Sequence, residues 1–138
     1  MKKEIGLWID HREAVIVTLQ DHAEDIQRIE SNVEQRVRYS GASDDNQGPS
    51  HNDGSEDKRD RRIEGHLDHY YDAVIAHMKD ATAVLIMGPA EAKNEFAKHF
   101  ESRQPLIKIV NIEAADKMSD IQIIAKVRRN FELYEFTH

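Results

Sequence analysis

The sequence of 138 residues has no cysteine, three prolines and one tryptophan. The absence of cysteine excludes a disulfide scaffold, a thiol nucleophile, a zinc site with cysteine ligands and an iron–sulfur cluster. No apolar run approaches the roughly 20 residues of a membrane-spanning helix, and the start, Met1-Lys2-Lys3-Glu4, lacks the apolar core of a signal peptide. We therefore expect a cytoplasmic protein with no membrane partner, folded as a single domain over residues 1–138.

Positive charge is scarce overall but locally concentrated. The chain has 19 Lys and Arg residues against 26 Asp and Glu, a net charge of −7. Residues 40–57 contain five of the acids and no base, which leaves −2 for the rest of the chain. The basic segment Lys58-Arg59-Asp60-Arg61-Arg62 follows directly. This balance argues against non-specific nucleic-acid binding by the whole surface, but it does not exclude a phosphate-rich partner at the basic segment.

Patterns of period two predict strands at the start of the chain. Residues 5–9 show an alternating pattern with a period of two. Residues 14–19 are apolar at both odd and even positions, which is typical of a central strand. Residues 25–30 and 33–39 each have a polar face. The short polar segment 10–13 suits a hairpin turn, so the pattern predicts an antiparallel meander with one solvated side.

Residues 40–57 have a single aliphatic member, Ala42, and three of the six glycines. Such a segment cannot bury enough apolar surface to offset the entropy of ordering it, so we predict a flexible acidic loop. Loops of this length inside a compact domain are often functional, although an insertion without a function is an equally good interpretation.

From Lys58 onward the apolar spacing becomes helical. One stripe predicts a long helix and consists of Ile63, Leu67, Tyr70, Tyr71, Val74, Ile75 and Met78. Residues 83–87 form a short apolar run, typical of a buried parallel strand. Pro89 suits the first position of the next helix, predicted over about 90–101. Its inward residues are expected to be Phe96, Ala97 and Phe100.

The last part of the chain adds a predicted strand, 106–110, and a helix that begins at a capping box of Ser119 with Gln122. An antiparallel meander followed by helical crossovers onto parallel strands favours an α/β fold. The fold that we predict is a mixed five-stranded ribonuclease-H-like sheet, antiparallel and then parallel, flanked by three helices.

A sheet of this kind raises the hypothesis of a metal-dependent phosphoesterase or nuclease, in which several carboxylates hold two ions. Asp10 follows the first strand and is the candidate first ligand, but the strand at 83–87 ends without an acid. Glu64, Asp68 and Asp72 recur at intervals of four on the long helix, where a solvated acidic face is the commoner explanation. We expect Asp10 to be a turn residue and assign no catalytic residue, with the phosphoesterase kept as an alternative.

Metal and cofactor sites are not indicated either. The eight histidines are scattered, and no two lie four residues apart, so we assign no metal ligand and no cofactor. The corner Gly88-Pro89-Ala90-Glu91 lies where phosphate-binding loops occur, but Pro89 has no N–H to donate and Glu91 repels an anion. A tight strand-to-helix corner is its expected role.

Six basic residues are the candidates for binding RNA or another partner. Two lie on the polar face of the predicted strand before the acidic loop, and four follow the loop. If the two ends of the loop are neighbours, these cations surround its base: Arg36, Arg38, Lys58, Arg59, Arg61 and Arg62. Each contact with a phosphate would add salt-dependent affinity. A solvated surface, partly neutralised by the acids of the loop, is the alternative interpretation.

A further alternative is a self-associating protein-interaction module. Residues 132–136 alternate like an edge strand, which would pair with a neighbouring chain. The aromatic residues of such an assembly would be Trp8, Tyr134 and Phe136.

Three stretches taken together carry a family resemblance. Residues 5–10 with 13–16 are similar to an opening hairpin, residues 83–96 (AVLIMGPAEAKNEF) to a strand, glycine-containing corner and lysine-bearing helix, and residues 107–112 to the strand that follows. In this order they resemble the central domain of the archaeal and eukaryotic class-one peptide release factors and of pelota. The resemblance covers nearly the whole chain, as a single-domain relative of bacterial type, and implies a ribonuclease-H-like fold.

The resemblance also sets an expectation for function. In release factors, the connection before the long helix carries a Gly-Gly-Gln tip that directs water to the peptidyl ester. The corresponding segment, 40–57, contains Asn46-Gln47-Gly48 and no Gly-Gly-Gln. The resemblance therefore implies a non-enzymatic translation-machinery-like domain that binds ribosomal or structured RNA, or translation factors, without peptide-release activity.

Overall fold

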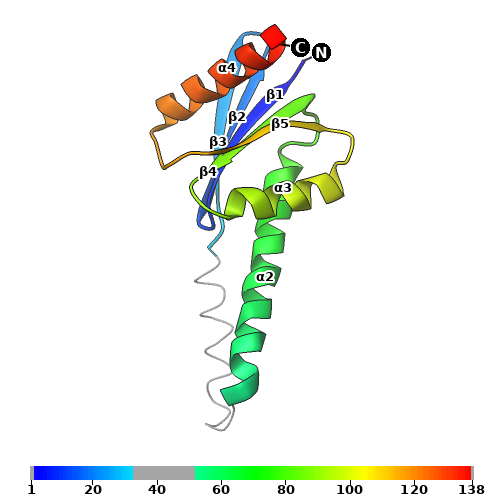
Figure 1. Ribbon diagram of the computed structural model, residues 1–138, viewed down its shortest axis with the longest axis vertical. Helices are drawn as coiled ribbons and strands as arrows, with labels where there is room; N and C mark the ends of the chain where they lie inside the picture. Colours follow the sequence, from blue (N-terminus) through cyan, green and yellow to red (C-terminus); the bar gives the residue numbers. More distant parts are fainter. Residues whose placement is uncertain (1, 33–51, 138) are drawn as a thin grey trace.

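A computed structural model of the chain describes residues 2–32 and 52–137, with side chains in the second range described from Arg61 to Glu135. Within these ranges, five strands form one mixed sheet in the order β3-β2-β1-β4-β5, and three helices pack on it (Figure 1). The predicted α/β fold is confirmed. No helix in the described ranges is long and apolar enough to cross a membrane.

The antiparallel half consists of β1 (Glu4–Ile9), β2 (Glu13–Gln20) and β3 (Ala23–Glu30). The β2–β3 connection is a two-residue turn, because Gln20 pairs with Ala23. Its two residues, Asp21 and His22, have φ angles of 54° and 66°, as the tight hairpin turns that match strand twist require. The predicted strand at 33–39 lies outside the described residues.

The parallel half consists of β4 (Ala83–Gly88), which pairs with β1, and β5 (Lys108–Ala114), which pairs with β4. The strand predicted at 106–110 therefore begins and ends later than expected. Leu106 and Ile107 are apolar but belong to the turn after the preceding helix, where the Ile107 amide donates to the Gln104 carbonyl at 3.2 Å. Period-two patterning cannot separate two apolar turn residues from the strand that they precede.

The helices cover the two faces of the sheet unequally. The helices α2 (Asn52–Ala76) and α3 (Ala92–Arg103) lie on one face, and α4 (Asp120–Thr137) lies on the other (Figure 1). Each face buries its own cluster of apolar side chains. The first includes Tyr70, Val74, Phe96 and Phe100, and the second includes Trp8, Val127 and Phe131.

The start of α2 corrects the predicted bounds of the acidic loop. Helix α2 begins at Asn52, so residues 52–57 are helical rather than part of a loop. The rest of the predicted loop, residues 40–51, lies outside the described residues. The low apolar content of 52–57 suggested a loop. However, acidic residues such as Asp53 and Glu56 are favourable in the first turns of a helix, where they face the positive end of its dipole.

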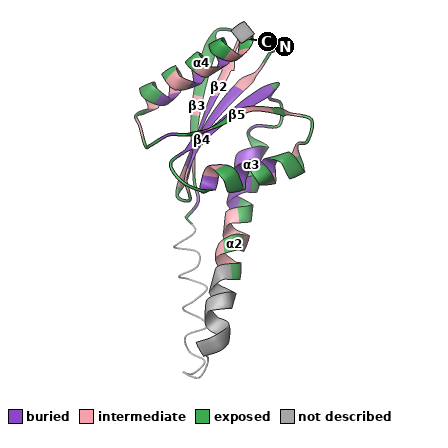
Figure 2. Cartoon of the chain, viewed as in Figure 1, coloured by how far each residue is buried: buried purple, intermediate pink, exposed green. Residues whose placement is uncertain are grey.

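The apolar stripe of α2 is confirmed in its C-terminal half. Tyr70, Tyr71, Val74 and Ile75 are buried, as is Met78 in the turn that follows. Farther towards the N-terminus, Ile63 and Leu67 are only half-buried (Figure 2). We call the part of α2 up to Leu67 the projecting part, because there the helix extends beyond the edge of the sheet (Figure 1).

The end of the chain is helical, which overturns the predicted edge strand at 132–136. The capping box is confirmed: the Ser119 amide donates to Gln122 Oε1 at 2.9 Å, and the Gln122 amide donates to Ser119 Oγ at 3.3 Å. From this start α4 continues to Thr137. A five-residue alternation is too short to compete with a helix whose inward residues, Ile123, Val127 and Phe131, are already buried.

Trp8 is buried, so it is wrong as one of the contact residues of the self-association hypothesis, while self-association itself stays a prediction. Its side chain is 2% exposed. The indole N–H donates to two backbone carbonyls in the connection between β5 and α4, to Ala115 at 3.0 Å and to Asp116 at 3.2 Å. Trp8 therefore ties this connection to the centre of the sheet.

Candidate partner-binding site

Asp10 is a turn residue, as the sequence predicted. Its Oδ1 accepts hydrogen bonds from the amides of Arg12 and Glu13, both at 2.8 Å, and its own amide donates to the Glu13 carbonyl at 3.0 Å. Among the residues that the structure describes, no three or more acidic or histidine side chains are placed to hold a metal ion. The carboxylate of Asp10 is thus used to close the β1–β2 turn.

The corner after β4 is tight. A Cβ atom at Gly88 would lie 2.2 Å from the carbonyl oxygen of Ile9, so only glycine allows β4 to pass the end of β1 this closely. At the start of α3, the amides of Asn94 and Glu95 both donate to the Glu91 carbonyl at 3.0 Å. The first turn of α3 is thus closed by the backbone, as expected for a structural corner.

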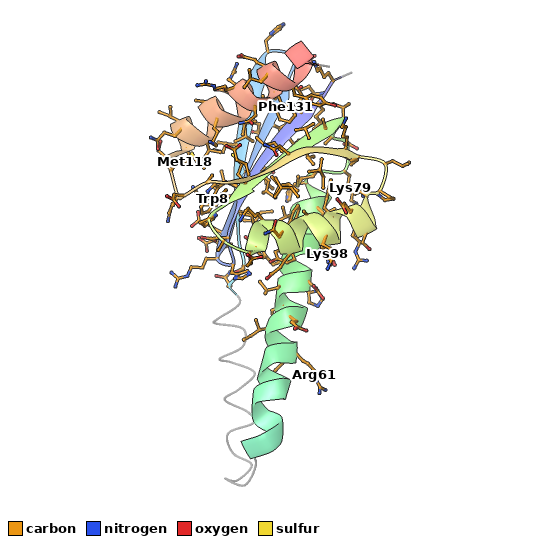
Figure 3. The ribbon with its side chains drawn as sticks, in the orientation of Figure 1. Trp8, Arg61, Lys79, Lys98, Met118 and Phe131 are labelled. Carbon is orange, nitrogen blue, oxygen red and sulfur yellow. The ribbon has the colours of Figure 1, made fainter. Side chains whose placement is uncertain are left out.

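The six basic candidates are placed to different degrees. Arg36 and Arg38 lie outside the described residues. Lys58 and Arg59 are on α2, and their side chains are likewise outside the described set. The side chain of Arg61 is exposed on the projecting part of α2 (Figure 3), and Arg62 beside it is half-buried. The gathering of all six around one point stays a prediction.

The projecting part of α2 carries its basic residues well away from the sheet. Among the α2 side chains that the structure describes, from Arg61 onward, the first buried one is Tyr70. Arg61 precedes it by nine residues, which corresponds to about 13 Å along a helix axis. Figure 1 shows the same separation, with the N-terminal end of α2 as the most distant described part of the fold. Among the described residues, the basic group of Arg61 is thus exposed at a distance from the sheet.

Two buried tyrosines hold the other half of α2. The Tyr70 hydroxyl donates to the Asp10 carbonyl at 3.0 Å, and the Tyr71 hydroxyl donates to Glu95 Oε1 at 2.8 Å. His11 Nε2 lies 2.9 Å from the same oxygen of Glu95. Burial raises the pKa of both phenols well above the usual value, so they remain donors. These bonds join α2 to the β1–β2 turn and to α3.

A second set of polar contacts, the α2–α3 polar cluster, consists of Asp68, Asp72, His99 and Arg103. His99 Nε2 lies 2.7 Å from Asp72 Oδ1, and Arg103 Nε donates to the same oxygen at 3.1 Å. His99 Nδ1 lies 3.9 Å from Asp68 Oδ1. The acidic face predicted on α2 is therefore not only solvated, because two of its carboxylates face α3.

Sequence reasoning missed this cluster because its two halves are far apart in the chain. Asp72 and His99 are separated by 27 residues, and Asp72 and Arg103 by 31. One signal was present: acids at an interval of four on one helix and bases at an interval of four on the next. Such spacing places each pair on one face of its helix, but only packing decides whether the two faces meet.

Asp72 provides a test of the cluster by pH. The hydrogen bond from His99 lowers the pKa of the Asp72 carboxyl below its ordinary 3.8. A carboxyl whose pKa is lower in the folded than in the unfolded state stabilises the fold at pH values above the unfolded-state pKa. This stability is lost as the pH falls below about 4. We expect Asp72→Asn to lower the free energy of unfolding by less than about 1 kcal/mol near neutral pH, because the side chain is 45% exposed. In acid the loss of unfolding free energy should be smaller still.

Urea unfolding followed by the fluorescence of Trp8, the one tryptophan, measures this difference at several pH values. Asp25→Asn is the matched control, because Asp25 is an exposed aspartate on β3. A difference between wild type and Asp72→Asn that stays constant down to acid pH would contradict the prediction.

Comparison with known proteins finds similar structures but no similar sequences. No family model and no curated protein matches the sequence. The pelota protein of Thermoplasma acidophilum matches with a TM-score of 0.54 and 16% identity, over 87% of this chain and 30% of that one. Pelota of Archaeoglobus fulgidus matches with a TM-score of 0.54 and 14% identity, over 92% of this chain and 31% of that one. An archaeal translation termination factor, aRF1, matches with a TM-score of 0.50 and 12% identity, over 97% of this chain and 40% of that one.

The resemblance seen in the sequence is thus confirmed at the level of the fold. The chain spans less than half the length of each of these three proteins. At such identities the comparison establishes a shared fold and a distant structural relationship, while function depends on the site.

Proposed function

We propose that this chain is a translation-factor-like binding domain that contacts structured RNA, ribosomal RNA above all, through the N-terminal end of α2. In this proposal the domain acts in the cytoplasm and catalyses no reaction. The observation that carries the proposal is the exposed Arg61 on a helix that projects from the sheet, within a run of four bases in five positions, 58–62. The fold shared with an archaeal translation termination factor supports it.

The local charge fits such a contact. Bases at 58, 59, 61 and 62 follow one another around the helix, since successive residues are about 100° apart. In this proposal, basic positions spread around the helix axis would suit the phosphates of a folded RNA, which lie in several directions around the helix. Arg36 and Arg38, which precede the helix in sequence, would add two contacts if they lie nearby. Each phosphate neutralised releases counterions and makes binding salt-dependent.

The proposal excludes peptide release. Release requires a group that positions water at the ester, and the segment before α2 contains no Gly-Gly-Gln. The domain would therefore bind where a release factor binds, or at another structured RNA, without hydrolysing the ester.

Co-sedimentation with ribosomes over a series of salt concentrations tests the proposal. We expect the protein to enter the ribosomal fraction at low salt and to leave it as salt rises. The double substitution Arg59→Glu with Arg61→Glu is expected to weaken binding at least tenfold at low salt. It should also reduce the slope of log K against log salt by about 2, one for each cation removed.

Lys79→Glu is the matched control, because Lys79 is exposed in the turn at the opposite end of α2 (Figure 3). It changes the net charge in the same direction but lies far from the basic segment. We expect it to bind nearly as wild type does. The proposal is overturned if wild-type protein is absent from the ribosomal fraction at every salt concentration. It is also overturned if Lys79→Glu loses as much binding affinity per reversed charge as the double substitution does.

A further inference from the structure

We propose that His99 is a proton-responsive contact that determines how far along α2 the helix is held against α3. When the imidazole is neutral, α3 holds α2 at Asp72. When it is charged, α3 holds α2 at Asp68 as well, one turn nearer to the projecting part. This device does not depend on RNA binding, so the two proposals fail or stand separately.

The position of His99 carries the inference. Its side chain is only 15% exposed. One ring nitrogen faces Asp72 at 2.7 Å and the other faces Asp68 at 3.9 Å. Asp68 and Asp72 lie on successive turns of the same face of α2, so the ring spans one turn of the helix. The Tyr71 ring, 5.9 Å away between centroids, limits its movement.

Protonation changes the number of hydrogen-bond donors that His99 offers. A neutral imidazole has one N–H, whereas the imidazolium has two. The 2.7 Å contact with Asp72 uses the Nε2 proton, which leaves Nδ1 without a proton in the neutral ring. Its lone pair then faces the carboxylate of Asp68. In the charged ring an N–H faces Asp68, and the contact at that turn becomes attractive.

The charges around the ring favour the same direction. From α2, Asp68 and Asp72 contribute two negative charges, and from α3 itself Arg103 contributes one positive charge. The remaining excess of one negative charge is neutralised when His99 is charged. On the far side of Tyr71, Glu95 and His11 form a separate pair, which therefore needs its own control.

The consequence for α2 follows from where Asp68 lies. Residues from Tyr70 onward are held by the core, whereas the side chains of residues 61–67 are half-buried or exposed. Asp68 is at the boundary between these two parts. A contact there that forms when the ring is charged, and is lost when the ring is neutral, would restrain the projecting part.

Amide hydrogen exchange of the full chain tests this inference. After correction for intrinsic exchange rates, we expect the amides of residues 64–72 to be about threefold to fivefold better protected at pH 5.5 than at pH 7.5, the size of a partly exposed ion pair. The ¹⁵N signals of the His99 ring should show protons on both nitrogens at the lower pH and on one at the higher pH.

Two substitutions remove the response in different ways. His99→Gln keeps an N–H donor for Asp72 but has no titrating charge, and Asp68→Asn removes the charge that the second N–H faces. Both are expected to abolish the pH dependence of exchange. His77→Gln, an exposed histidine in the turn after α2, and His11→Gln should leave it in place.

Each result decides for or against the inference. Equal protection at the two pH values in the wild type overturns it, as does a pH dependence that survives in Asp68→Asn. A response that disappears in His11→Gln would assign it to the pair with Glu95 and also overturn the inference. Because Asp68 is 64% exposed, its substitution leaves the protein folded even if His99→Gln does not.

Discussion

Replacing Phe96 with alanine is expected to lower the free energy of unfolding by about 3–5 kcal/mol. Phe96 is 0% exposed and lies on α3 in the centre of the cluster shared by α2, α3 and the sheet. Its ring centroid is 5.7 Å from that of Tyr71, edge to face, and 5.9 Å from that of Phe100, stacked. Truncation removes these contacts and leaves a cavity that the packed neighbours cannot fill.

Urea unfolding followed by Trp8 fluorescence gives the magnitude. A loss of this size approaches the whole free energy of unfolding of many domains of this length. Phe96→Leu therefore provides a milder variant, which should also lower the free energy of unfolding. Leu106→Ala is the matched control, because Leu106 is apolar but 98% exposed and should change stability by no more than about 0.5 kcal/mol. Comparable losses at positions 96 and 106 would contradict the described core.

Gly6→Ala is expected to destabilise the fold by about 2–3 kcal/mol because it forces α4 away from the sheet. A Cβ atom at this position would lie 2.2 Å from Val127 Cγ2 and 2.6 Å from Val127 Cγ1. Val127 is itself fully buried, so its side chain has no space to turn into. The helix would have to shift as a body, with loss of contacts along its inward face.

A double-mutant cycle with Val127→Ala tests this cause directly. Val127→Ala removes the two γ carbons, so the cost of Gly6→Ala in that background should be clearly smaller than in the wild type. Gly65→Ala is the control: it lies on α2, and apart from its own stretch of helix no described atom lies within 4 Å of its added Cβ. We expect it to stabilise the protein by about 0.5–1 kcal/mol. Additive costs for Gly6→Ala and Val127→Ala would show that strand and helix do not meet as described.

The sequence alone predicted those features that depend on neighbouring residues. The alternation at 5–9 and the apolar run at 83–87 indicated the central strands, the three-and-four spacing from Tyr70 to Met78 indicated the buried face of α2, and Ser119 with Gln122 indicated the start of α4. Each depends on interactions within a few residues, so a local pattern suffices. The arrangement of these elements then followed from general rules of connection, and the family resemblance agreed with it.

Element ends were decided by tertiary structure. The residues 132–136 have a strand pattern, yet they continue a helix whose earlier turns are already packed on the sheet. Likewise, Leu106 and Ile107 have strand composition but lie in a turn, because β5 can begin only where it meets β4. Packing of the preceding or neighbouring element outweighs a propensity of a few tenths of a kcal/mol per residue.

The contacts that hold the candidate site depend on the tertiary structure still more. Asp72, His99 and Arg103 carry no motif, and nothing in their local sequence indicates that α2 and α3 place them together. The same is true of Gly6 with Val127 and of the Trp8 indole with the β5–α4 connection. Local sequence determined which helices and strands form, since those are short-range choices. Which charged side chains face one another was decided only when the helices packed on a common sheet, because that proximity arises from burial of apolar surface far along the chain.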